Sequence, residues 1–221
     1  MKLLLSALSK FIFGLLFVGL LLFVPAGTIH YFNAWLFIAL LFIPIFILGI
    51  FLFVKSPELL KKRLNAKEKE KTQKSVVSIS ALLFLLGFIV AGLDYRFNLS
   101  TVSKPVVIVA SCILLISYAL YAEVMRENVY LSRTIEVQEN QKVIDKGLYK
   151  IVRHPMYAVT VWLFLSIPII LGSWYSLICF IPYIPIIIVR IINEEKFLEK
   201  ELDGYTDYKK RTKYRLIPFI W

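Results

Sequence analysis

Long apolar runs are the feature that most limits how this chain can fold. Six segments are almost wholly apolar, at about 3–24, 33–54, 76–93, 105–122, 155–172 and 174–192. A helix needs about 20 such residues to cross a hydrocarbon core of about 30 Å. We therefore expect an all-α, polytopic membrane protein with about six transmembrane helices. The last two are separated only by "GSWYS", which predicts a tight helical hairpin followed by a cytosolic helical tail.

The composition agrees with a membrane protein. Hydrophobic residues make up 59% of the chain and the mean hydropathy is +0.74, more than a water-soluble domain of this size can bury. In a soluble chain the formal charge of +11 would suggest a nucleic-acid partner. Here the basic residues flank apolar runs, which is the pattern that sets topology and attracts anionic headgroups. We expect the lipid bilayer as a partner and no nucleic acid; the oligomeric state stays open.

The basic residues also predict an orientation. Of the 26 Lys and Arg residues, only Arg96 and Lys104 would lie outside if the N-terminus is cytosolic. This asymmetry follows the positive-inside rule and places both termini in the cytosol, at the cell membrane if the source is prokaryotic. Asp94 and Arg96, at the end of the third apolar run, would then face the outside, and we interpret them as a structural clamp.

The character of the chain changes after residue 122. Residues 1–122 form a region of four apolar helices, whereas residues 123–221 contain a polar connector, the helical hairpin and the tail. Ionisable residues concentrate in this second region, so we expect any chemistry there. Cys112 and Cys179 lie inside apolar runs without Cys or His at metal-ligand spacing, so neither a metal site nor a disulfide is expected.

The stretch "GLYKIVRHPMY" contains one of the two histidines. A residue before proline is pushed away from α geometry, and proline is well accommodated at the first position of a helix. His154 should therefore be the last non-helical residue and Pro155 should open the fifth helix. The free N–H groups of a helix N-terminus can seat a carboxylate or phosphate, and the same field favours the neutral imidazole ring.

Tyrosines and aliphatic residues surround this histidine in the sequence. Tyr149 and Tyr157, with Val143 and Ile144, could provide flat and apolar walls for a heteroaromatic ring. An alternative is that this His, Tyr and Arg cluster only fixes the depth of the helix at the membrane interface.

A second polar stretch, "RIINEEKFLEKELDGYTDYKKR", follows the last apolar run. Arg190 and Glu194 have the spacing of a helical ion pair, and Glu195 turns to an adjoining face. Charges also occur where any helix leaves the bilayer, but Arg190 lies near the hydrocarbon boundary, where an ionised side chain needs a partner. Pro182 and Pro185 predict a kinked or opened backbone in the same helix.

Together, "GLYKIVRHPMY", "EEKFLEKELDGYTDYKKR" and the terminal "RLIPFIW" resemble the isoprenylcysteine carboxyl methyltransferase family and its phospholipid and small-thiol methyltransferase relatives. These are multipass membrane enzymes that use S-adenosylmethionine. The resemblance covers about residues 123–221 and says little about the substrate.

The resemblance implies roles for particular residues. Its cofactor-holding elements fall on Gly147, Tyr149, Arg153, His154, Pro155 and Tyr157, with Val143 and Ile144 leading into the pocket and Glu194 in the double glutamate. An arginine five residues before a glutamate is implicated near the acceptor, which gives catalytic roles to Arg190 and Glu195. The chain departs from many relatives at Leu148, where they have proline, and at Ala158 and Val159, where they have glycine.

The function that the resemblance implies is S-adenosylmethionine-dependent methyl transfer to a lipophilic or amphipathic acceptor. An isoprenylcysteine-type carboxylate is one candidate, beside a lipid amine, a small thiol or another lipophilic acid. Two alternatives come from other classes: an NADPH-dependent membrane reductase of the sterol-reductase type, and a non-enzymatic carrier or assembly factor.

Overall fold

A computed structural model describes residues 2–64, 71–131 and 136–221, and these residues form helices joined by turns and loops. The first apolar runs become α1 (Lys2–Ala26), α2 (Phe32–Lys55), α4 (Lys71–Phe97) and α5 (Lys104–Glu127). A short helix, α3 (Pro57–Leu64), follows α2. Each of the four long helices is long and apolar enough to cross a membrane. The chain is therefore an all-α, polytopic membrane protein.

The fifth and sixth apolar runs form the predicted hairpin. α7 (Pro155–Ile170) is a shorter apolar helix, and after a turn the chain continues through α8 (Trp174–Phe180) and α9 (Tyr183–Glu201). α8 and α9 together make one span that is interrupted at Ile181 and Pro182, so the kink that the prolines predict is confirmed. The predicted helical tail consists of the end of α9 and α10 (Tyr205–Arg211).

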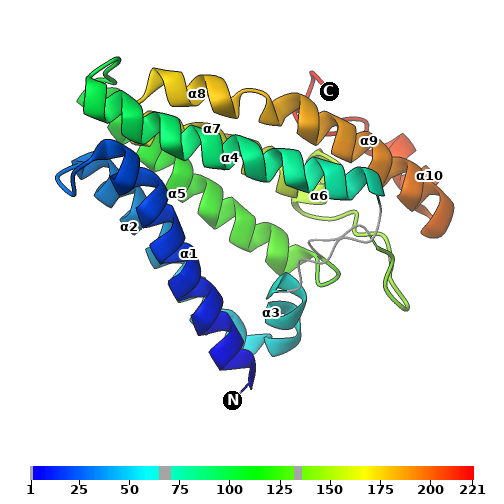
Figure 1. The fold of residues 1–221 in the computed structure, drawn as a ribbon. Helices are drawn as coiled ribbons and strands as arrows, with labels where there is room; N and C mark the ends of the chain where they lie inside the picture. The colour runs from blue at the N-terminus through cyan, green and yellow to red at the C-terminus, as the bar shows by residue number, and fades with distance from the viewer. Residues whose placement is uncertain (1, 65–70, 132–135) are drawn as a thin grey trace.

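The long helices pack around a core at the end of the molecule that holds the α7–α8 turn. α5 packs along α7, α1 packs along α4, and α4 lies beside α8 and α9 (Figure 1). Leu22, Phe37, Leu114, Ile170 and Phe180 bring five helices together in this core and are almost fully buried. The core anchors the start of α8 and the end of α7, while the polar ends of α7 and α9 project to the opposite end.

Asp94 ties α4 to the α7–α8 turn. Its carboxylate accepts from the backbone N–H of Ser100 at 2.7 Å and from the hydroxyls of Ser100 and Ser173. Asp94 is 1% exposed, so these donors offset the loss of its hydration. The clamp expected at Asp94 is confirmed. For Arg96 a clamp is not shown: its guanidinium lies 5.6 Å from the centre of the neighbouring Phe97 ring, which is a contact within α4.

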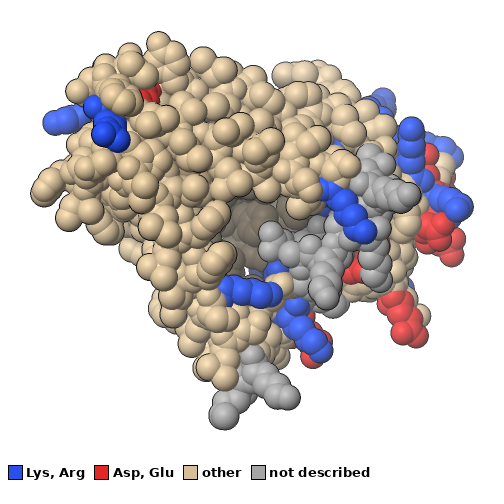
Figure 2. Space-filling view, viewed as in Figure 1, with Lys and Arg blue, Asp and Glu red and all other residues tan. Residues whose placement is uncertain are grey.

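Charged side chains on the face shown in Figure 2 gather at the end that holds α9 and α10 and in the lower part of the view around α3, and a small group lies at the opposite end of α4. The surface between this small group and the others is uncharged. Large apolar residues are exposed on the outer faces of α1, α2 and α5, among them Phe13, Ile47 and Ile108. Such a surface suits lipid contact.

Candidate functional site

The N-terminus of α7 has the geometry that the His-Pro sequence predicts. His154 is the N-cap residue, with φ −124° and ψ 61°, and Pro155 opens the helix. The side chain of His154 makes no capping hydrogen bond to α7. A short helix, α6 (Leu148–Ile151), precedes α7, and residues 152–154 join the two helices. Residues 212–221, the C-terminal segment, hold this junction through backbone hydrogen bonds. Arg153 N donates to Tyr214 O and His154 N donates to Arg215 O, both at 2.9 Å.

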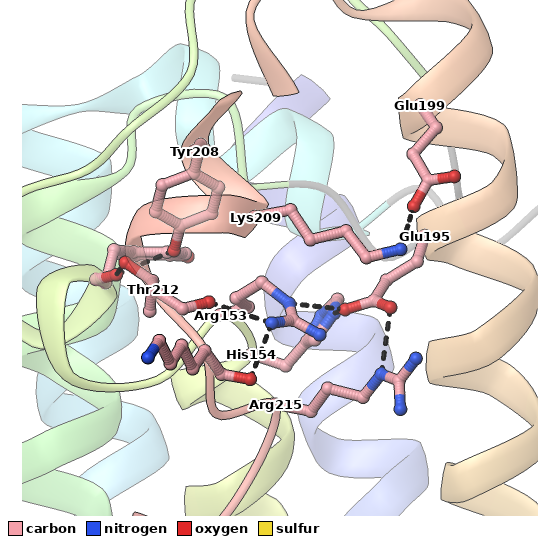
Figure 3. A network of polar contacts seen from close by, with 10 residues as sticks. Arg153, His154, Glu195, Glu199, Tyr208, Lys209, Thr212 and Arg215 are labelled. Atoms are coloured by element: carbon pink, nitrogen blue, oxygen red, sulfur yellow. Dashed lines mark hydrogen bonds and ion pairs between the residues drawn. The ribbon is translucent and has the colours of Figure 1, made fainter. Parts of the chain in front are cut away.

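Three nitrogen donors converge on the carboxylate of Glu195, which α9 supplies (Figure 3). Arg153 Nε lies 2.6 Å from Oε1, His154 Nε2 lies 3.2 Å from Oε1, and Arg215 Nε lies 2.9 Å from Oε2. A carboxylate only accepts hydrogen bonds, so Nε2 of His154 carries a proton in this arrangement. The network joins α9, the α6–α7 junction and the C-terminal segment at a single point.

Arg153 has further acceptors in the same place. Its Nη1 donates to the backbone carbonyls of Thr212 and Lys213, each at 2.8 Å. Arg153 is 6% exposed and Glu195 is 2% exposed. A buried ion pair of this kind is well tolerated only when its remaining hydrogen-bonding groups also find partners, as they do here.

A cavity lies beside this network, between the connector that follows α5, the start of α7, the end of α9, and α10. Nine of the eleven residues singled out in the sequence line it. They are Val143, Ile144, Tyr149, Arg153, His154, Pro155, Tyr157, Arg190 and Glu194. The structure thus brings together residues from positions 143 and 194, which are far apart in the sequence.

In this cavity the hydroxyl of Tyr157 contacts two charged residues of α9, Arg190 and Glu194. Its hydroxyl donates to Glu194 Oε2, and it accepts from Arg190 Nε at 2.9 Å. The Arg190 guanidinium also lies 5.8 Å from the centre of the Tyr157 ring. Arg190 is 8% exposed, so the expectation that it needs a partner near the hydrocarbon boundary is met by a tyrosine of α7.

Gly147 and Glu195 do not line the cavity. Gly147 has φ +57°, and a Cβ there would lie 1.6 Å from Glu127 Oε1. The Glu127 carboxylate accepts from Leu148 N at 2.9 and 3.1 Å, which fixes the first turn of α6 against the end of α5. Because glycine leaves room for Glu127 here, α6 can dock against the end of α5, and this docking positions Tyr149 of α6 in the cavity wall. Glu195 lies behind the cavity wall, where it holds Arg153 and His154.

Several cavity residues were not predicted from the sequence. They are Asn128, Tyr130, Leu131, Glu136, Gln141, Lys142, Met156, Leu198, Leu202, Tyr205 and Tyr208. The connector residues among them follow no helical or strand period. Tyr205 and Tyr208 had a signal, because "DGYTDY" places two tyrosines three apart after a glycine, which is the spacing of one helix face. Gly204 has φ +83° and separates α10 from α9.

Buried phenols form the wall that α10 contributes. Burial raises the pKa of both Tyr205 and Tyr208, so both hydroxyls remain protonated at neutral pH. Tyr208 Oη donates to the backbone carbonyl of Tyr149 at 2.6 Å, and Asn128 Nδ2 donates to Tyr149 Oη at 2.9 Å. These bonds hold α6 and α10 together as two adjoining sides of the cavity.

Part of the chain matches a known protein family. The model of the phospholipid methyltransferase family matches residues 105–203, which run from the start of α5 through the end of α9 and into the turn before α10. Comparison with curated proteins found no significant relative. The matched region contains the helical hairpin and all of the cavity residues except Tyr205 and Tyr208. It also contains Arg153, His154 and Glu195 of the polar network, but not Arg215. The resemblance seen in the sequence is confirmed, because residues 105–203 match the phospholipid methyltransferase family.

Proposed function

We propose that the cavity binds S-adenosylmethionine and that the chain transfers its methyl group to a lipophilic acceptor. The observation that carries this proposal is the mixture of groups in one cavity of a methyltransferase-family region. Arg190 and Glu194 provide both signs of charge, and tyrosines with aliphatic residues provide flat apolar walls.

This mixture suits the parts of the cofactor. An amino-acid end with a carboxylate and an ammonium group needs donors and acceptors close together, and a purine needs a flat, apolar surface. The uncapped N-terminus of α7, which begins directly after His154, suits the carboxylate, and Glu194 suits the ammonium group. Tyr149 and Tyr205, with Val143, suit the nucleoside.

When bound, the cofactor would supply a methyl group on a positively charged sulfur; an acceptor would bond to the methyl carbon in line as the carbon–sulfur bond breaks, and S-adenosylhomocysteine would leave as a neutral thioether. The protein then needs to hold the acceptor in line and to exclude water. We assign the orientation of an anionic acceptor to Arg190, whose guanidinium is fixed by Tyr157. A carboxylate or thiolate acceptor needs no strong general base, which agrees with a cavity that has one histidine.

An apolar groove on the outside of the helices supports a lipophilic acceptor. It runs between α5, α6, α7 and the C-terminal segment, and it is lined by residues such as Leu120, Ile151, Val159 and Trp162. Pro155 lines both this groove and the cavity. A lipid chain in the groove would place its head group at the start of α7.

In this proposal residues 123–221 hold the cofactor site, residues 1–122 form the helical region beside it, and the site faces the cytosol.

The proposal can be tested by following the methyl group. Vesicles that contain the purified protein and native lipids receive methyl-labelled S-adenosylmethionine, and the organic extract is analysed for label. We expect label in a lipid or lipidated fraction with the wild type and a loss of at least tenfold with Arg190→Gln. The control is Lys196→Gln, since Lys196 is exposed on α9 and lies outside the cavity. Label confined to water-soluble material would contradict a lipophilic acceptor.

A further inference from the structure

Tyr205 is the first residue of α10 and lines the cavity. It is 4% exposed. Its hydroxyl is buried, and within residues 2–64, 71–131 and 136–221 it has no hydrogen-bond partner. A buried hydroxyl without a partner has lost its hydration and gained nothing in return, which is uncommon in native structures. A polar atom of this kind at a cavity wall marks a place where a bound molecule can supply the partner.

Tyr208 provides a comparison on the same helix. It is 2% exposed, and its ring centre lies 5.8 Å from that of Tyr205. Its hydroxyl, however, donates to the backbone carbonyl of Tyr149 at 2.6 Å. α10 therefore directs one phenol to an acceptor of the protein and leaves the other at the cavity wall. The raised pKa of Tyr205, caused by burial and then by the charges of Glu195 and Glu194, keeps its proton available for donation.

The surroundings of Tyr205 indicate which part of a ligand it meets. Tyr205 packs in a cluster with Leu202 and Tyr208, and with the partly buried Val137, Val143 and Leu198. This wall is apolar and aromatic. The cavity side chains that suit an amino-acid end come from other elements, namely the start of α7 and the middle of α9. The Tyr205 wall therefore suits a nucleoside, whose ring nitrogens and ribose oxygens accept hydrogen bonds.

We propose that the Tyr205 hydroxyl donates a hydrogen bond to the nucleoside of the bound cofactor, and so helps to select an adenosine-containing ligand. This inference rests on the proposed function, because it takes the ligand to be S-adenosylmethionine. Tyr205 acts here as a binding residue and takes no part in the transfer of the methyl group.

The test uses two probes and two variants of the full-length protein. S-adenosylhomocysteine contains both the nucleoside and the amino-acid end, whereas 5′-methylthioadenosine contains only the nucleoside. Titration calorimetry gives their affinities for the wild type, Tyr205→Phe and Tyr208→Phe. We expect Tyr205→Phe to weaken both probes by the same factor, about 3- to 10-fold, as for one lost hydrogen bond. The unfolding temperature without ligand should not fall, because the hydroxyl has no partner within the described protein.

Tyr208→Phe is the matched control. It should lower the unfolding temperature without ligand, because the Tyr149 carbonyl loses its donor at 2.6 Å and keeps only the longer contact of 3.5 Å from the Thr212 hydroxyl. Equal affinities of wild type and Tyr205→Phe for both probes would overturn the inference while leaving the proposed function intact. Weaker binding of S-adenosylhomocysteine alone would overturn the placement at the nucleoside. A wild type that binds neither probe would overturn the proposed function and this inference together.

Discussion

Glu194 and Glu195 are neighbours in the sequence and face different surroundings. Glu195 is 2% exposed and holds Arg153, His154 and Arg215 behind the cavity wall, while Glu194 lines the cavity and accepts from Tyr157. Helical geometry explains the difference, because successive residues of a helix point about 100° apart. The position of Glu195 favours a positioning role through its three partners over contact with the reacting atoms.

Exchanging each glutamate for glutamine separates the two roles. Glu195→Gln leaves the buried guanidinium of Arg153 without its charge partner, so we expect the free energy of unfolding to fall by about 3–5 kcal/mol. Glu194→Gln should lose less stability and should weaken S-adenosylhomocysteine binding. Thermal unfolding in mild detergent and calorimetry measure the two effects. A Glu195→Gln variant as stable as the wild type would contradict the structural role of the network.

At the scale of elements, the long helices and a helical tail could be predicted, but the positions of the short helices could not. Runs of about 20 apolar residues predict a membrane helix without any knowledge of tertiary structure. α6 and α10 have four and seven residues, and contacts from distant segments hold them, such as the bond from Tyr208 to Tyr149. A pattern of neighbouring residues in the sequence cannot predict contacts between segments that are far apart in the sequence. The His-Pro junction was predictable because the constraint that proline imposes is local.

The junction between α5 and α6 gives a prediction at this scale. Gly147→Ala puts a side chain at φ +57° and into the Glu127 carboxylate, so it should destabilise the fold by about 1–3 kcal/mol from backbone strain alone. It should also weaken cofactor binding, because Tyr149 moves with α6. The control is Gly49→Ala, since a Cβ at Gly49 in α2 meets nothing within 4 Å.

Thermal unfolding of both glycine variants checks this prediction. Gly49→Ala should match or exceed the wild type, because alanine favours a helix over glycine by roughly 1 kcal/mol. If both variants unfold at the same temperature, the Glu127 carboxylate, which accepts from Leu148 N beside Gly147, does not hold α6 in place.

The whole molecule is built from an apolar middle and two polar ends of unequal charge. The site residues lie at the end rich in Lys and Arg, near α9 and α10, and Asp94 with the α7–α8 turn lies at the other. The sequence predicted this division because charges flank the apolar runs. The sequence could not predict the shape of the cavity, whose walls come from the connector, α6, α7, α9 and α10, because their docking depends on the Glu195 network.

The orientation in the membrane gives a prediction at the scale of the molecule. In a background without Cys112 and Cys179, single cysteines replace two exposed residues at opposite ends, Leu99 and Lys200. Because the basic end should be cytosolic, an impermeant thiol reagent should label Leu99→Cys in intact cells and Lys200→Cys only in opened cells. The reverse pattern would place both termini outside.

The measurement that tests the central claim most directly is a titration of the purified protein with S-adenosylhomocysteine and, separately, with NADPH. A ligand that binds only the folded protein raises its unfolding temperature by mass action. We predict a saturable rise with S-adenosylhomocysteine, a weaker rise for Glu194→Gln at the same concentration, and no rise with NADPH. A rise with NADPH alone would assign the cavity to a reductase, and no rise with either would contradict an S-adenosylmethionine site.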